Sequence, residues 1–173
     1  MSPDNPQQKI EFLTLFFGWP KKSFYQAVYR GATPLGQLES EFDEDTFCEE
    51  MMTETTDLFI NSQKEKIIYP LASKYIEDKI ERKVLPIKLS DMYLSQDKVV
   101  SGYPPDHAKV LYEFLLYCLT SDQADLAVEF HADFIINWTN KLASAIIKRS
   151  PSLMFTRIAH LIEELNHEFA KVV

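Results

Sequence analysis

The chain has 173 residues, of which 46% are hydrophobic and 25% are charged, an ordinary balance for a globular domain. Its 18 basic and 26 acidic residues give a formal net charge of −8. This charge argues against non-specific nucleic-acid binding and against docking on anionic membranes, and it suits a basic partner. A chain of this length buries roughly 70% of its unfolded surface. We therefore expect one domain over residues 1–173, with a core that needs neither disulfides nor metals.

The two cysteines, Cys48 and Cys118, fall in apolar helical stretches and form no C-x-x-C cluster. We interpret both as buried free thiols. The first residues lack a basic region followed by an apolar one, and the most apolar run, residues 110–119, is too short to cross a bilayer. These features predict a cytoplasmic protein.

Helical periodicity dominates the first half of the chain, which contains few turn-forming glycines. Pro70 falls in an irregular connector around residues 62–76, because proline lacks an N–H and forces its predecessor toward extended geometry. Pro86 is expected to open a helix. The elements expected in this half are helices over 7–17, 20–30 and 45–61, the connector over 62–76, a solvated helical turn over 77–83 and a helix over 86–95.

The second half predicts three long amphipathic helices with very short connections. The first begins at Pro104, with Asp106 in its first turn; Thr120 and Gln123 form a capping box for the second; Ser150 caps the third. Apolar stripes at helical spacing mark the face that each helix buries. Helices joined in this way pack antiparallel. The sequence therefore predicts an all-α, single-domain helical bundle with long antiparallel C-terminal helices.

Motifs for catalysis are scarce: the sequence lacks a nucleophile elbow, a phosphate-binding glycine loop and a zinc-protease H-E-x-x-H. One E-x-x-H occurs, at Glu164 and His167. A di-iron bundle site needs a second copy and two further glutamates, which we do not find. We interpret the pair as solvated, and we keep a metal-dependent bundle enzyme using it as the alternative function. His131 and Asp133 are interpreted as surface residues.

Residues 103–107 place a phenol, an acid and an imidazole, those of Tyr103, Asp106 and His107, at a predicted helix start. Two interpretations compete. One is a simple helix start, with proline fixing φ and the aspartate facing the helix dipole. The other is a polar cluster at the end of a groove that binds a peptide or another ligand.

The pattern Y-x-P-x-D-H at the start of an amphipathic helix resembles the signature of the TorD/DmsD family, cytoplasmic chaperones that assemble molybdenum-cofactor oxidoreductases. Three further segments resemble family segments in order and spacing, over about residues 54–140. One departure is Phe134, which stands where the family often has histidine, so no role of that histidine transfers. The three segments are residues 56–60 (TDLFI), 69–75 (YPLASKY) and 134–138 (FIINW).

The resemblance implies a chaperone that is not an enzyme and has no cofactor or metal of its own. Its partner would be the catalytic subunit of a molybdopterin-dependent oxidoreductase, bound through the twin-arginine signal peptide and in the apo form before export. Such a peptide joins a basic region to an apolar one, which an acidic protein with an apolar groove complements. The sequence leaves open the client, direct binding of nucleotide or molybdopterin, and whether the chain is a monomer or a domain-swapped dimer.

The peptide-binding residues that we predict are a polar group and an apolar group. The polar end of the groove consists of Tyr103, Asp106 and His107. The apolar walls consist of Leu58, Phe59, Tyr75 and Trp138. From the helical rise, Trp138 and His107 lie near the same end of the bundle, which predicts a shared pocket.

Overall fold

The computed structural model describes residues 5–60, 67–150 and 152–171. Over these ranges the chain is built of α-helices, a short 3₁₀ helix (η1) and a π-helical turn (η2). In chain order they are α1 (Pro6–Phe17), α2 (Lys22–Tyr29), α3 (Glu44–Phe59), η1 (Ala72–Tyr75), α4 (Lys79–Ser95), α5 (Ala108–Thr120), α6 (Ala124–Phe130), η2 (His131–Ile135), α7 (Ile136–Arg149) and α8 (Leu153–Ala170).

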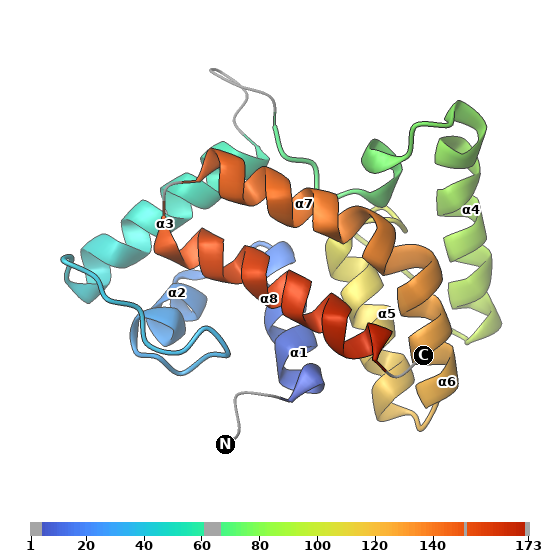
Figure 1. Cartoon of the computed structure of the whole chain (residues 1–173), viewed down its shortest axis with the longest axis horizontal. Coiled ribbons are helices and arrows are strands. Elements are labelled where there is room, and N and C mark those ends of the chain that lie inside the picture. The colour runs from blue at the N-terminus through green and yellow to red at the C-terminus, as the bar shows by residue number, and fades with distance from the viewer. Residues whose placement is uncertain (1–4, 61–66, 151, 172–173) are drawn as a thin grey trace.

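The helices form one bundle around a continuous hydrophobic core. Helices α7 and α8 run antiparallel side by side, and α4 stands at the far edge of the molecule (Figure 1). Helix α1 packs on α5, and α2 packs on α3. The prediction of an all-α bundle with long antiparallel C-terminal helices is confirmed. Both cysteines are free and buried, as predicted.

Local sequence explains several helix starts. The Asn5 side chain accepts a hydrogen bond from Gln7 N at the start of α1, where Pro6 loses nothing by lacking an N–H. Asp43 caps α3 by accepting from Thr46 N at 2.9 Å, and acidic residues follow in the first turn.

Helix α4 begins earlier than the sequence predicted, and Pro86 lies inside it. Most of the charged segment expected to be a solvated helical turn is helical and forms the first part of α4. The carboxylate of Asp78 accepts from Ile80 N and Glu81 N, both at 2.8 Å. This strong N-cap starts the helix, which continues through Pro86 despite the hydrogen bond that the proline cannot make.

The helix expected from Pro104 begins instead at Ala108, and His107 is its N-cap. Asp106 lies before the helix rather than in its first turn. A single antiparallel bridge joins Leu71 to His107, and Ala108 N donates to Pro70 O at 2.8 Å. These contacts hold residues 104–107 as a turn against the connector, so a contact distant in sequence sets the helix start.

The capping box predicted at Thr120 and Gln123 is absent. Thr120 is the last residue of α5, and its hydroxyl donates back to Leu116 O at 2.9 Å. Gln123 precedes α6 without a side-chain capping bond. The predicted cap at Ser150 is also wrong, because α8 starts at Leu153 and the Ser150 hydroxyl bonds the carboxylate of Glu54. Pro151 lies outside the described residues.

The long helix predicted after residue 123 contains a π-helical turn, where Ile136 N donates to His131 O. The interpretation of His131 as a surface residue was wrong: it is 2% exposed and stacks on Phe169, with ring centroids 4.4 Å apart. Its Nε2 lies 2.9 Å from Asn166 Oδ1. Burial lowers the pKa of His131, so the imidazole is a neutral core group. Asp133 is exposed, as predicted.

Lys9 joins the first helix to the last. Its ammonium lies 2.6 Å from Glu168 Oε1 and 3.3 Å from Glu164 Oε2. The Lys9 side chain is almost fully buried, so the two carboxylates compensate a charge that burial alone would disfavour. Separately, none of the described helices combines the length and apolarity needed to cross a membrane.

Candidate functional site

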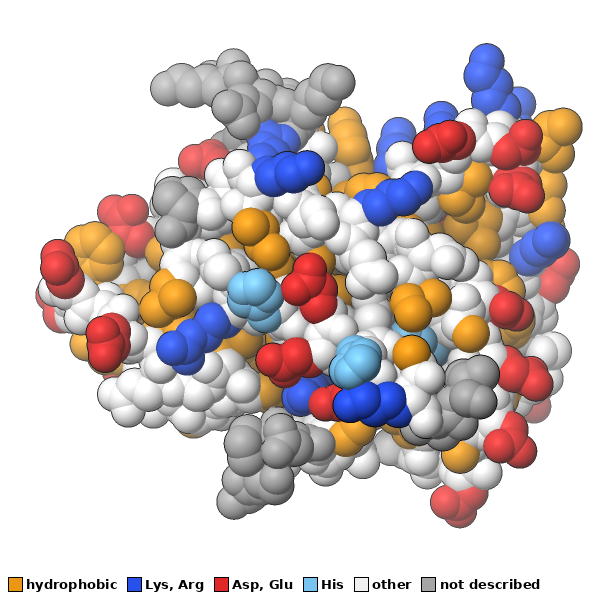
Figure 2. Space-filling model, in the orientation of Figure 1, with side chains coloured by type: hydrophobic (Ala, Val, Ile, Leu, Met, Phe, Trp, Pro, Cys, Tyr) orange, Lys and Arg blue, Asp and Glu red, His pale blue; other side chains and the backbone are white. Residues whose placement is uncertain are grey.

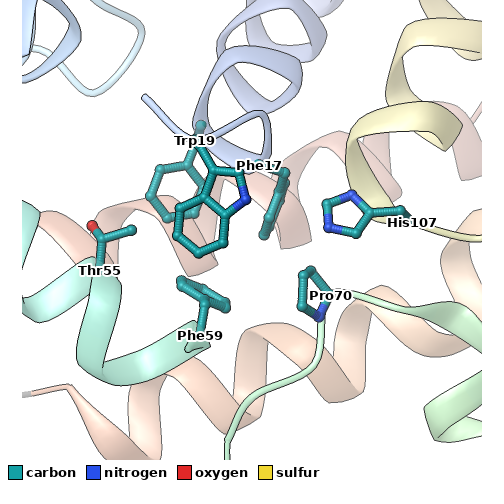
Figure 3. Close-up of a pocket in the computed structure, with 7 residues that line it drawn as sticks. Phe17, Trp19, Thr55, Phe59, Pro70 and His107 are labelled. Carbon is teal, nitrogen blue, oxygen red and sulfur yellow. The ribbon is translucent and has the colours of Figure 1, made fainter. Parts of the chain in front are cut away.

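An aromatic recess lies where the end of α1, the end of α3 and the start of α5 meet. Figure 3 shows the rings of Trp19, Phe59 and Pro70 around one space, and Phe17 lies between Trp19 and His107 in this view. The recess is shallow, with a free volume of about 10 Å³, enough for about one water molecule. The residues that line it are Phe16, Phe17, Trp19, Thr55, Phe59, Pro70 and His107.

Trp19 covers this recess and is half exposed. Helix α1 ends at Gly18, whose N–H donates to Leu15 O at 3.2 Å. The next residue, Trp19, has a φ of +62°, a left-handed conformation that is uncommon for a bulky residue. Its side chain is 45% exposed. A large apolar group held in water beside an aromatic floor is typical of a binding surface rather than a core.

His107 supplies the polar group of the recess. Its Nδ1 accepts from Lys109 N at 3.2 Å, and its ring packs against Tyr103 with centroids 4.7 Å apart. Burial lowers the pKa of His107 to about 4, against a smaller opposing effect of Asp106. The imidazole is therefore neutral near neutral pH, with its proton on Nε2. Among the described residues, no hydrogen-bond acceptor is found for Nε2, so this N–H remains available to a bound group.

Asp106 faces a different partner. It is 3% exposed, and its Oδ2 accepts from Ser73 N at 2.9 Å, while its carbonyl accepts from Ala72 N at 3.0 Å. Its carboxylate thus caps the first turn of η1 from outside that helix. Asp106 does not line the recess. It holds the connector against the start of α5.

Tyr75 and Trp138 pair with each other away from the recess. Their ring centroids lie 5.6 Å apart. The Trp138 ring is 4% exposed, and its Nε1 donates to Phe134 O at 2.9 Å. Burial raises the pKa of Tyr75 to about 12. Trp138 is not among the residues that line the recess; the Tyr75–Trp138 pair fastens η1 to α7.

Of the seven residues predicted from sequence, Phe59 and His107 line the recess and Tyr103 packs beside His107. Leu58 is buried next to Phe59, and its carbonyl accepts from Ile68 N at 2.9 Å. Sequence reasoning missed Trp19. The available signal was a tryptophan between Gly18 and Pro20 directly after an apolar helix, where no following helical turn can bury it.

Helix α3 brings negative charge to this region. Residues 31–63 contain nine acidic residues and no lysine or arginine. Arg30 pairs with Glu44 and Lys22 pairs with Asp45, whereas Glu49 and Glu50 are exposed on the helix. Figure 2 shows acidic side chains along the edge of the molecule formed by α3. The recess thus adjoins the C-terminal end of an acidic helix.

The alternative function, a metal-dependent bundle enzyme, would use Glu164 and His167. Glu164 is held by Lys9, and His167 is exposed on α8. Within the part of the chain that the structure describes, no group of three His, Cys, Asp or Glu residues could hold a metal ion. No observation at Glu164 and His167 therefore favours metal chemistry.

Comparisons of the chain with family models, with curated proteins and with solved structures gave no match. The resemblance to the TorD/DmsD family accordingly rests on the sequence motifs alone.

Proposed function

We propose that this chain is a chaperone that binds an apolar segment bearing basic residues, namely the twin-arginine signal peptide of a molybdopterin-dependent oxidoreductase subunit. In this proposal it acts in the cytoplasm on the apo form of that subunit, before export. The client class comes from the resemblance of residues 54–140 to the TorD/DmsD chaperones. The observation that carries the binding function is the aromatic recess under the half-exposed Trp19.

The binding mode follows from the side chains around the recess. A bulky apolar side chain of the peptide packs against the exposed Trp19 ring beside Phe17 and Phe59, because the free volume of the recess is too small to admit it. The His107 Nε2–H donates to a carbonyl of the peptide. Arginines on the same peptide lie toward α3, where exposed carboxylates complement their charge.

Calorimetry with a synthetic twin-arginine peptide tests this proposal. Trp19→Ala should weaken peptide binding about tenfold, equivalent to about 1.4 kcal/mol, and should cost less folding stability than removal of a buried aromatic ring, because the Trp19 ring is half exposed. Leu153→Ala is the matched control, since Leu153 is also 45% exposed but lies on α8 outside the recess. Equal peptide affinities of wild type and Trp19→Ala would contradict the proposal.

Fluorescence gives an independent readout of the same event. Peptide binding should change the emission of the wild type, and Trp19→Phe should abolish that change, because the remaining indole, Trp138, is buried in the core. The affinity should also fall with added salt if peptide arginines meet the carboxylates of α3. A change that persists in Trp19→Phe would assign the binding surface to the surroundings of Trp138 instead.

A further inference from the structure

A second cavity lies between the loop that follows α4 and one face of α5. Its volume is about 270 Å³. It shares no lining residue with the aromatic recess. The residues that line it are Tyr93, Lys98, Val99, Val100, Ser101, Lys109, Val110, Glu113, Phe114 and Tyr117.

The walls of this cavity are apolar and well supported. Phe114 packs against Tyr93, with ring centroids 4.9 Å apart, and against Tyr117 at 5.9 Å. The loop is held at its start, where Lys98 N donates to Tyr93 O at 2.9 Å. Val99 is 84% exposed at the rim. Three aromatic rings and three valines thus offer a surface on which a flat apolar ligand can pack.

Two lysines lie at the rim, and within the described part of the chain only one of them is paired with a carboxylate. The Lys109 ammonium is neutralised by Glu113 at 2.7 Å. The Lys98 ammonium lies 3.8 Å above the centroid of the Tyr117 ring, and among the described residues no carboxylate pairs with it. An ammonium has three N–H donors, and a ring face below it leaves those on the outer side open. The cavity therefore presents one uncompensated positive charge beside an apolar floor.

We propose that this cavity binds a small aromatic monocarboxylate, with the carboxylate on Lys98 Nζ and the ring on Val110 and Phe114. One free cation matches a single negative charge, and the carboxylate of Glu113, which also lines the cavity, disfavours a dianion. A single substituted ring fits the volume. The site is separate from the aromatic recess, so this inference does not depend on the proposed chaperone function.

Amide chemical-shift titration of the full chain with phenylacetate tests the site, and phenylacetamide serves as the uncharged analogue. In the wild type, phenylacetate up to about 10 mM should give saturable shifts centred on residues 98–101 and 110–117. Phenylacetate should bind about fivefold more tightly than phenylacetamide, because one partly exposed ion pair contributes about that much affinity. Lys98→Met keeps the length of the side chain and should abolish this preference. Lys148→Met, on the exposed face of α7, should retain it.

Three outcomes would overturn the proposal. The first is the absence of saturable shifts at the cavity residues of the wild type. The second is an unchanged preference for the acid in a Lys98→Met variant whose spectrum remains dispersed. The third is a set of shifts centred on Trp19 and His107, which would put the ligand in the aromatic recess. If Lys98→Met loses spectral dispersion, the acid-to-amide comparison in the wild type alone decides the case, and equal affinities would count against the site.

Discussion

Asp106 and His107 are adjacent in the chain and serve different parts of the molecule. The Asp106 carboxylate turns toward η1 and satisfies the N–H of Ser73. The His107 ring turns toward the recess and leaves its Nε2–H without an acceptor among the described residues. A short motif thus combines a residue that holds the fold with one that is available to bind.

Replacing Asp106 tests its structural role. Asp106→Ala leaves the partly buried Ser73 N–H without its acceptor, so we expect a loss of about 1–3 kcal/mol in the free energy of unfolding, measured by urea titration. Asp106→Asn should lose less, because the amide oxygen can still accept. Asp133→Ala, an exposed acid on η2, is the control and should change little. An unchanged urea midpoint for Asp106→Ala would refute the capping role.

Some residues of the recess and its support could be predicted from the sequence, and others could not. Phe59 and His107 were predictable because each begins or ends an apolar stripe next to a polar or charged segment. Trp19 and Asp106 were not, because their roles depend on neighbours far along the chain. Trp19 lines the recess with Phe59 and Pro70, and Asp106 accepts a hydrogen bond from the 3₁₀ helix η1.

At the scale of elements, helix interiors were predictable and several helix starts were not. The apolar stripes identify α1, α3, α5 and α8, because the helical period is a local property. The start of α5 is set by its bridge to Leu71, and the π-helical turn lies within a stripe that reads as regular helix. Pro86 was misplaced for a related reason: the cap at Asp78 overrides the local preference of proline for a helix start.

Helix α4 carries an identifiable defect at Pro86, whose missing N–H leaves the carbonyl four residues earlier without its helical donor. Pro86→Ala should restore that bond. Part of the gain is offset because alanine makes the unfolded chain more flexible, so we expect about 1–3 kcal/mol of added stability. Thermal unfolding measures it, with the exposed Ile87→Ala as a control that should not stabilise. A lower melting temperature for Pro86→Ala would show that the proline ring contributes packing that outweighs the hydrogen bond.

At the scale of the whole molecule, two buried neutral histidines link stability to pH. The pKa of His107 is lowered to about 4 and that of His131 is lowered as well, both chiefly by burial. In the unfolded chain each titrates near 6.5. Because the unfolded state binds more protons between these values, the stabilisation is complete above about pH 6.5 and is lost as the pH falls toward 4.

The lowered pKa of His107 reduces the free energy of unfolding at pH 5 by about 2 kcal/mol relative to its value above pH 6.5. Urea unfolding at about pH 7 and about pH 5 should therefore show a marked loss of stability in the wild type. His107→Asn keeps an N-cap acceptor for α5 and removes the titrating group, so its loss between the two pH values should be smaller by about that amount. An identical pH dependence in the two proteins would mean that His107 is not buried in the neutral form.

The contact between Lys9 and Glu164 has a consequence for synthesis on the ribosome, because the two residues are 155 positions apart. Helix α1 packs on α5 and α8, and its Phe16 ring also lies near Phe24 and Phe59 from parts of the chain that precede α5. At translation rates of about 5–20 residues per second, Lys9 waits about 8–30 s before its partners on α8 are made. The contact between α1 and α8 thus forms late in synthesis, and it joins the first and last described helices.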